Sequence, residues 1–443
     1  MASTDIVGLA QAAVEACPAD QAEAFVYEAR SAVTRFAENT IHQNTSEYHR
    51  SLTVRAVVGR RIATARAEVA SIDDARRLAV EAAELARVAQ ELPDFVSLPA
   101  PKPIPPNPRR PAPDVVEATA GTRADLVSAA TDQAQKRGYR AAGALTVEIS
   151  SICVANSLGI LAARESSGCH FHVVTRGEDT AGYAASEGPA LADAKVAETA
   201  ELAADIADQA KQRQSVEPKP MDVVLRPVAA AELLGAFAAT GFSALAYQEQ
   251  QSFVCDWLGQ RACAPELTVI DDGMDTRTYA ASFDYEGVPK QRVDLIRDGV
   301  VCGLVYDSYT AGREVPPRES TGHAAPPGYG AGPTPMNLVV HQGDAALDDL
   351  ISRIDRGLLV SRIHYLNIAH RRQALFTGMT REGTLLIRNG RIVGGVLDLR
   401  FTERMVEAFR RLVAIGMHGE LHGHVWTPPL VIEAFSFTSA TTL

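Results

Sequence analysis

The sequence lacks the features that mark secreted, membrane-spanning or disulfide-stabilised proteins. Its six cysteines are scattered and form no Cys-x-x-Cys pair, so we expect them to be reduced and mostly buried. No window of about 18 uncharged apolar residues occurs, which predicts no membrane span. The N-terminus carries Asp5 but neither a basic stretch nor an uninterrupted apolar core, unlike a signal peptide. We therefore predict a cytoplasmic protein.

Basic charge is also in short supply. The chain has 43 lysines and arginines against 54 aspartates and glutamates, which gives a net charge of −11. This balance argues against a protein built mainly to neutralise phosphate, and it predicts no nucleic-acid partner. The nucleotide-binding pattern GxxxxGK[ST] and the serine-nucleophile pattern GxSxG are both missing.

What is present is the composition of a large globular protein. The 443 residues are enough for two or three domains with a large core, and a hydrophobic fraction of 46% is ordinary for such a chain. The patterns predict an α+β fold. We expect an N-terminal α+β domain with antiparallel meander sheets over 1–218, and a mostly antiparallel β domain over 219–443.

The N-terminal region alternates between helical and strand periodicity. The predicted elements are, in order, a helix over 5–17, strands over 23–30, 32–43 and 47–68, a helix over 71–92, a helix over 123–137, a strand over 141–150, a hairpin over 151–174 and an Ala-rich helix over 189–212. The Gly59-Arg60-Arg61 break predicts a turn inside the third strand segment. The Ala-rich helix is expected to pack closely on the sheet.

A proline-rich stretch separates the two parts of this region. Residues 93–113 contain nine prolines, so the chain there must be extended, without helix or central strand. We interpret the stretch as a stiff surface connector. The alternative, a ligand for SH3 or WW domains, has no other signalling feature to support it.

From Met221 onward, turn dipeptides become frequent and apolar runs shorten. A buried strand at 223–225 leads into a helix that has Pro227 in its first turn and ends near Gly241. Two later segments, 295–305 and 386–396, each place Asp-Gly or Asn-Gly between short strands, the pattern of a type I′ hairpin. Because six of their eleven positions are identical, we read them as equivalent hairpins of one β-rich domain.

Several motifs of the C-terminal half occur in the order and spacing of a known family. The half resembles the TldD/PmbA (TldD/TldE) metallopeptidase family over about residues 220–443. The resemblance is carried by the stretch 221–253, by Ser282–Pro289 (similar to Asp-x-Glu-Gly-x-Pro), and by 335–338, 343–344, 355–360, 377–384, 389–390 and 435–439. In the N-terminal half only the order of elements is similar.

The resemblance also shows what this chain lacks. Catalytic members carry His-Glu-x-x-x-His after two leucines on the helix that corresponds to 227–241. Here those three positions hold Gly235, Ala236 and Thr240, none of which is a good zinc ligand. The family's third ligand is a cysteine in the region that corresponds to 375–378, and no cysteine follows Cys302. We therefore expect no zinc, no other cofactor and no catalytic residues in this chain.

The resemblance implies the function of a TldE/PmbA-like, metal-free subunit. It would form a heterodimer or higher assembly with a TldD-like chain that supplies zinc and hydrolyses peptides or peptide-like amides. This chain would supply interface area and strand edges that hold an extended peptide. Two alternatives stay open. The chain is a self-sufficient hydrolase or tailoring enzyme with an unrecognised site, or a homo-oligomeric peptide-binding module.

Histidines offer the main alternative site. His418, His422 and His424 lie within seven residues, and a strand would place the last two on one face. Glycines between them argue against a helix, so we favour solvated histidines over a metal site. His170 and His172 also share a strand face but have no third donor.

Two polar stretches carry weaker signals. Asp271, Asp272 and Gly273 are interpreted as a turn rather than as a catalytic dyad. The Gly/Pro-rich loop 322–335 is interpreted as a surface excursion or, by family resemblance, as a flap beside the binding groove.

Overall fold

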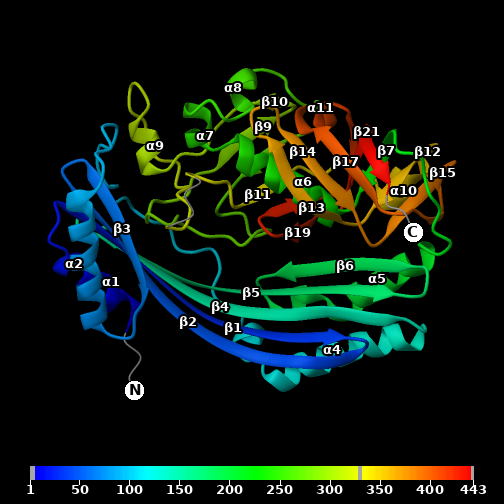
Figure 1. Cartoon of the computed structure of the whole chain (residues 1–443), viewed down its shortest axis with the longest axis horizontal. Coiled ribbons are helices and arrows are strands. Elements are labelled where there is room, and N and C mark those ends of the chain that lie inside the picture. Colours follow the sequence, from blue (N-terminus) through cyan, green and yellow to red (C-terminus); the bar gives the residue numbers. More distant parts are fainter. Residues whose placement is uncertain (1–4, 328–331, 441–443) are drawn as a thin grey trace.

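The computed structural model describes residues 5–327 and 332–440. A long, curved sheet formed by the N-terminal half lies along one side of the molecule, and the strand-rich residues 220–440, here called the C-terminal part, lie against it (Figure 1). The predicted α+β class and the strand-rich C-terminal region are confirmed. Among the described helices, the longest of which have 17 residues, none combines the length and apolar character needed to cross a membrane.

The long sheet has six strands, all antiparallel, in the order β3-β2-β1-β4-β5-β6. They are β1 (Gln21–Ala37), β2 (Thr40–Val58), β3 (Arg61–Glu68), β4 (Arg140–Asn156), β5 (Leu161–Arg176) and β6 (Ala181–Gly188). The predicted meander is present, but the breaks predicted at residue 31 and at 44–46 are wrong, because they fall inside β1 and β2. β1 runs unbroken past residue 31 and turns at Glu38 and Asn39, whose φ values of 50° and 60° suit a two-residue hairpin. The turn at Gly59 is confirmed.

Two pairs of helices cover the two ends of the long sheet. The helices α1 (Ile6–Ala16) and α2 (Ile72–Val88) share a core with β1 and β2, while α4 (Ala120–Lys136) and α5 (Val196–Gln209) share one with β4 and β5. The Ala-rich helix begins later than predicted, because Lys195 adopts a left-handed φ of 37° after a 3-10 turn. It packs closely, as expected: a Cβ at Gly182 of β6 would lie 2.0 Å from the Ala203 carbonyl oxygen.

The proline-rich connector is extended, as predicted, up to the short helix α3 (Pro113–Val116). It is a packed part of the structure. Asn156 of β4 donates to the Pro99 carbonyl oxygen, Lys102 pairs with Glu319, and Asn107 accepts a hydrogen bond from Ser282 N. The connector therefore contacts both the long sheet and the C-terminal part.

The C-terminal part contains two further sheets. One has the order β10-β9-β8-β11-β20-β19; the other has the order β13-β14-β17-β21-β7-β12-β15-β16, with β18 paired to β21. The strands are β7 (Pro220–Leu225), β8 (Val269–Asp271), β9 (Val293–Arg297), β10 (Val300–Val301), β11 (Leu338–Val340), β12 (Arg356–Val360), β13 (Ile363–His370), β14 (Leu375–Thr380), β15 (Thr384–Arg388), β16 (Arg391–Gly395), β17 (Leu399–Arg404), β18 (Leu412–Ile415), β19 (Glu420–His422), β20 (Val425–Thr427) and β21 (Leu430–Ala440). Most pairs are antiparallel, but β7–β12 and β11–β20 are parallel.

The helix α6 (Pro227–Gly241) contacts strands of both sheets. Its Phe237 stacks on Phe253 with ring centroids 4.3 Å apart and meets Phe409 at 5.0 Å. The described residues of this part also form the short helices α7 (Ala244–Gln248), α8 (Val254–Trp257), α9 (Ser308–Gly312), α10 (Leu347–Ser352) and α11 (Met405–Arg410), of which α7 contacts α6. The predicted strand and helix at 223–241 are thus confirmed, and α6 lies in the core.

The two look-alike segments form hairpins, as predicted. Positive φ values at Asp298-Gly299 and Asn389-Gly390 are those of type I′ turns. The hairpins belong to different sheets, however: β9–β10 to the first and β15–β16 to the second. Their similarity reflects shared turn chemistry, and their places in the fold are not equivalent. A division of the chain into two domains at residue 218 stays a prediction.

An ion-pair cluster joins the long sheet to the C-terminal part. Arg55 of β2 donates to Glu23 of β1 and to Glu286, each at 2.8 Å, and both carboxylates are buried. The second Glu286 oxygen accepts the Ser308 backbone N–H. Burial raises the pKa of Glu23 to about 7, although the charge of Arg55 opposes this shift.

This shift predicts a pH-dependent contribution to stability. The folded chain protonates Glu23 near pH 7 and the unfolded chain near pH 4.5, so the free energy of unfolding should fall as the pH rises between these values. In Glu23→Gln this fall should disappear, and the variant should gain up to roughly 3 kcal/mol over the wild type across that window. Urea unfolding at pH 5 and pH 8 measures the difference. The exposed Glu47→Gln controls for net charge; equal pH slopes in wild type and Glu23→Gln would contradict the prediction.

Candidate functional site

The residues at the family's metal-binding positions lie on α6 and offer no metal donors. Gly235 faces Val425, since a Cβ there would lie 3.4 Å from its methyl group. Thr240 is fully buried, and its hydroxyl donates to the Ala236 carbonyl oxygen at 2.6 Å. Within residues 5–327 and 332–440, no three His, Cys, Asp or Glu side chains come together as a metal site. The residues present therefore do not fit a zinc ion at α6.

The one charged residue of α6 has a structural partner. Glu232 accepts the backbone N–H of Ile363, at 2.9 Å, and so fixes the start of β13. Burial raises the pKa of Glu232 to about 7, while Arg362 and His422 act in the opposite direction. Sequence reasoning missed this residue, although a single carboxylate in an otherwise apolar helix was a usable signal.

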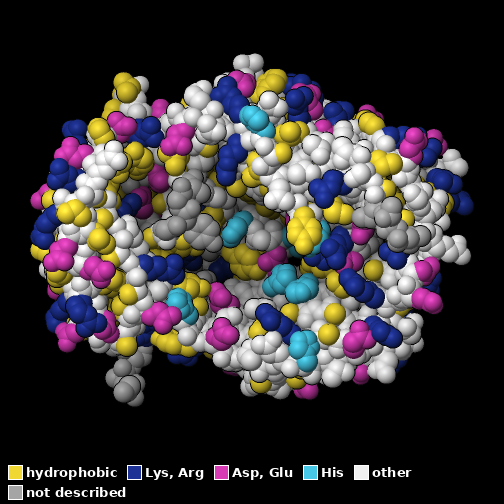
Figure 2. Space-filling view, in the orientation of Figure 1, with side chains coloured by type: hydrophobic (Ala, Val, Ile, Leu, Met, Phe, Trp, Pro, Cys, Tyr) yellow, Lys and Arg dark blue, Asp and Glu magenta, His cyan; other side chains and the backbone are white. Residues whose placement is uncertain are grey.

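Histidine side chains gather around a hollow in the middle of the face shown in Figure 2. His170 and His172 share a face of β5, as predicted, with ring centroids 5.3 Å apart. Burial lowers the pKa of both, to about 4 for His172, so they are neutral at pH 7. His422 contacts Glu420 at 3.2 Å.

The predicted shared face of His422 and His424 is wrong. β19 ends at His422, and Gly423, with a φ of 61°, turns the chain into β20. His424 therefore lies in a turn and, together with His170, lines the cavity described below, while His418 lies in the loop before β19. The structure does not bring the three histidines together as metal ligands.

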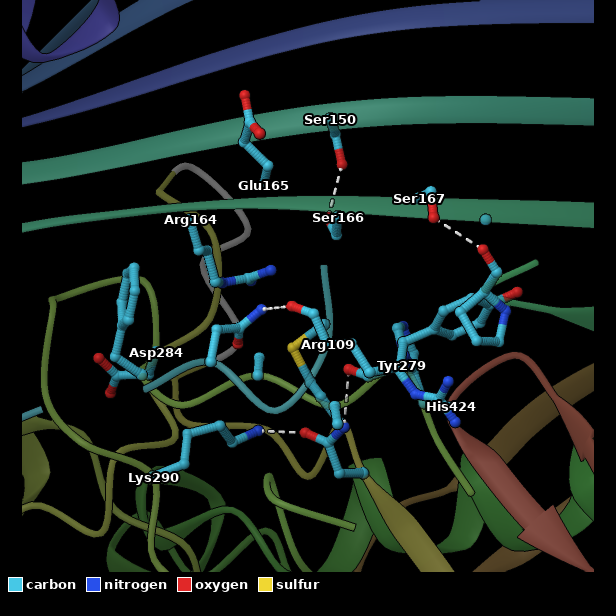
Figure 3. A pocket seen from close by; sticks show the side chains of 18 of the residues that line it. Arg109, Ser150, Arg164, Glu165, Ser166, Ser167, Tyr279, Asp284, Lys290 and His424 are labelled. Carbon is cyan, nitrogen blue, oxygen red and sulfur yellow. Dashed lines mark hydrogen bonds between the residues drawn. The ribbon is translucent and has the colours of Figure 1, made fainter. Parts of the chain in front are cut away.

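A cavity of about 350 Å³ lies between the long sheet, the connector and loops of the C-terminal part (Figure 3). Strands β4 and β5 form one wall, and the connector contributes Asn107 and Arg109. Residues 279–290 and the described ends of loop 322–335 also line it, as do Pro189, Met336, Asn337 and His424. The middle of that loop, 328–331, lies outside the described residues. His323, Ala324 and Thr334 on its two sides border the cavity, which places the described ends beside a potential binding space.

A buried cluster of Asp271, Lys290 and His323 lies at the wall of this cavity. Asp271 is fully buried; one oxygen contacts His323 Nε2 at 2.9 Å, and the other accepts the Asn337 N–H at 2.8 Å. Lys290 donates to the Asn337 side chain at 2.6 Å and lies 3.9 Å from Asp271. Burial opposes ionisation of Asp271, but the charges of Lys290 and His323 outweigh it and lower its pKa.

The sequence prediction for this stretch is half right. Asp272 and Gly273 form the expected turn, whereas Asp271 ends β8 as a buried ion-pair partner. His323 and Lys290 were missed because they lie far from Asp271 in the sequence. The predicted cysteine state is also confirmed in part: all six are unpaired, but only three are buried and Cys302 is exposed.

The family-like Ser282–Pro289 segment has a clear structural role. Asp284 accepts the backbone N–H groups of Glu286 and Val288 on one oxygen and that of Ala324 on the other. Gly287 has a φ of 75°, and a Cβ there would lie 2.6 Å from Ile160 of the long sheet. The Asp thus closes the turn, the Glu reaches Arg55, and the Gly allows close approach. Burial, together with Glu286, raises the pKa of Asp284 to about 8.

Comparison with known proteins gives matches along most of the chain. Residues 218–439 match the family described as PmbA/TldA metallopeptidase C-terminal domain, and residues 22–86 match PmbA/TldA metallopeptidase domain 1. An uncharacterised protein of Methanocaldococcus jannaschii is 31% identical over 157 residues, 35% of this chain and 37% of that protein. A metalloprotease TldD homologue of Haemophilus influenzae is 29% identical over 25% of this chain and 23% of its own. The chain thus spans less than half the length of these curated relatives.

Solved structures share the fold over nearly the whole chain. TldE from Thermococcus kodakarensis superposes with a TM-score of 0.87 at 19% identity, covering 97% of this chain and 99% of its own. A putative modulator of DNA gyrase from Thermotoga maritima gives a TM-score of 0.83 at 18% identity, covering 94% and 96%. Because the family match to residues 218–439 takes in half of the chain and a second match covers part of the long sheet, this protein belongs to the PmbA/TldD metallopeptidase family.

Proposed function

We propose that this chain is the metal-free, TldE/PmbA-like subunit of a cytoplasmic TldD–TldE-type peptidase. The carrying observation is the chemistry of α6, where Gly235, Ala236 and Thr240 replace the donors that a zinc site requires. The Thr240 hydroxyl donates a hydrogen bond to the Ala236 carbonyl oxygen within the helix, and turning the side chain toward a metal ion would break this bond. The likeness to a protein described as TldE, over 97% of the chain, supports the same assignment.

In this proposal, a TldD-type partner supplies zinc and the hydrolytic step. This chain contributes binding surface. β13 is an edge strand of its sheet, and Tyr365 on it is 68% exposed. An edge strand with free backbone groups can pair with an extended peptide or with a strand of the partner. β13 starts beside Glu232 on α6, so this edge lies close to the position that is catalytic in other members.

The alternative of a self-sufficient hydrolase gains little support from the described residues. His418, His422 and His424 are not assembled into a metal site. The Asp271–His323 pair resembles the positioning half of a catalytic triad, but both side chains are fully buried and face Thr321 and Asn337 rather than a nucleophile. The homo-oligomeric binding module remains the other alternative, and the partner experiment below separates it from the subunit.

The subunit proposal predicts that zinc and activity depend on a partner. Purified alone, the chain should hold well below one zinc ion and hydrolyse no peptide. Co-expressed with a TldD-type chain that has an intact His-Glu-x-x-x-His, it should co-purify with about one zinc per pair and with peptidase activity. Metal analysis and a peptide-cleavage assay measure both. Stoichiometric zinc and hydrolysis by the chain alone would refute the proposal, and failure to associate would favour the binding module.

A second prediction concerns the histidines. Replacing His418, His422 and His424 together by Ala should leave the metal content of the isolated chain unchanged, because the three do not converge on one point. Metal analysis after dialysis against zinc measures this, with thermal unfolding as the control for folding. A loss of bound zinc or of hydrolysis in the triple variant would instead establish the self-sufficient enzyme.

A further inference from the structure

The cavity between β5 and the C-terminal part holds positively charged side chains without acidic partners. Arg164 points into it from β5, and Arg109 enters from the connector (Figure 3). Among the described residues, neither guanidinium forms an ion pair, and the Nε of each is buried without a hydrogen-bond acceptor. Arg109 donates to the Thr276 carbonyl oxygen through another nitrogen. Arg164 lies over the rings of Phe283 and Tyr285, 5.6 and 6.0 Å from their centroids.

Lys290 adds a third positive group from another segment. Its side chain is only 5% exposed, and it borders the cavity. One of its three N–H groups donates to the Asn337 side chain. Asp271 lies 3.9 Å away and already forms hydrogen bonds with His323 and the Asn337 backbone N–H. At least one donor of Lys290 is therefore available to the cavity. Burial lowers the pKa of the Lys290 ammonium group; the charges of Asp271 and Asp284 oppose this shift, and the charge of Arg164 adds to it. Arg164 and Lys290 line the same cavity.

The acidic residues of the cavity wall are engaged elsewhere. Asp284 accepts three backbone N–H groups with its two oxygens. Glu148 accepts the Tyr27 hydroxyl. Glu165 follows Arg164 along β5, and its side chain points to the opposite side of the strand (Figure 3). Among the described residues, Arg164 is therefore left without a neutralising carboxylate, and Lys290 has only the 3.9 Å contact with Asp271.

The rest of the wall is largely apolar and aromatic. It includes Tyr279, Ala281, Phe283, Met336 and Pro189. A volume of about 350 Å³ is at the small end of ligand sites, suited to a small molecule or to one or two residues of a peptide. A ligand that fits this wall has a flat or aliphatic body and one anionic end.

We propose that this cavity binds a small organic carboxylate with an apolar body, its carboxylate held between Arg164 and Lys290 and its body against Tyr279 and Met336. A planar carboxylate matches the donors of a guanidinium, and burial strengthens such charge-assisted bonds. The same chemistry is found in the C-terminal residue of a peptide and in a free acylated amino acid. The proposal requires neither zinc nor a partner, so it stands or falls separately from the proposed function.

Isothermal titration of the full-length chain with four probes tests the proposal. The probes are N-acetylphenylalanine, its amide, N-acetyl-Gly-Gly-Phe and the amide of that peptide. We expect saturable binding of at least one free acid, with the matching amide at least about tenfold weaker because it lacks the charge. Binding of the peptide acid alone identifies a peptide C-terminus, and binding of acetylphenylalanine alone identifies a free small acid. Equal binding of acids and amides, or none, overturns the proposal.

Variants locate the site. Arg164→Gln should weaken binding of the free acid at least about tenfold, while Arg164→Lys, which keeps the charge, should lose less. Arg30→Gln removes an exposed arginine of β1, outside the cavity, and should bind as the wild type. Thermal unfolding without probe checks folding; should Arg164→Gln unfold, Lys290→Gln takes its place. Wild-type affinity in the folded variant overturns the proposal.

Discussion

A guanidinium held between two buried carboxylates joins the long sheet to the C-terminal part. Arg55 on β2 meets Glu23 from its own sheet and Glu286 from a turn 231 residues away in the sequence. That turn is itself closed by Asp284, which also ties down the start of the Gly/Pro-rich loop through Ala324. The turn that this cluster anchors contributes Phe283, Asp284 and Tyr285 to the cavity wall, and the connector contributes Asn107 and Arg109.

The polar groups that line the cavity lie away from the helix α6. The helix that carries metal ligands in catalytic family members is apolar here, apart from Glu232, and is packed between two sheets. The polar groups that can still receive a ligand lie instead where the long sheet faces the loops. In the proposed metal-free subunit, such a cavity would offer a space for one end of a substrate or for a small acid.

Local sequence patterns correctly predicted helix starts and turns, because proline and glycine determine these features within a few residues. Pro227 at a helix start, the Asn389-Gly390 turn and the Gly59 turn are all where the pattern placed them. The break predicted near residue 31 failed because β1 continues to Ala37, where Glu38 and Asn39 make a turn without glycine. No single-sequence pattern indicates that Asp271, Lys290 and His323 meet, because their contacts arise only when separate loops pack together. Site residues brought together by tertiary packing were therefore missed, although the family motifs on either side were recognised.

The position of β21 has a consequence for the order of folding. Residues 430–440 pair with β7 on one side and with β17 on the other, so the middle of this sheet is completed by a strand about 200 residues after β7. In the long sheet, by contrast, four of the five pairings are hairpins, and the β1–β4 pairing also lies within the N-terminal half. During synthesis, β7 and α6 cannot complete this sheet until β21 has emerged, so part of their apolar surface stays uncovered until then. Binding of a chaperone or a partner chain to this apolar surface would be most useful during that interval, because the surface is prone to aggregate.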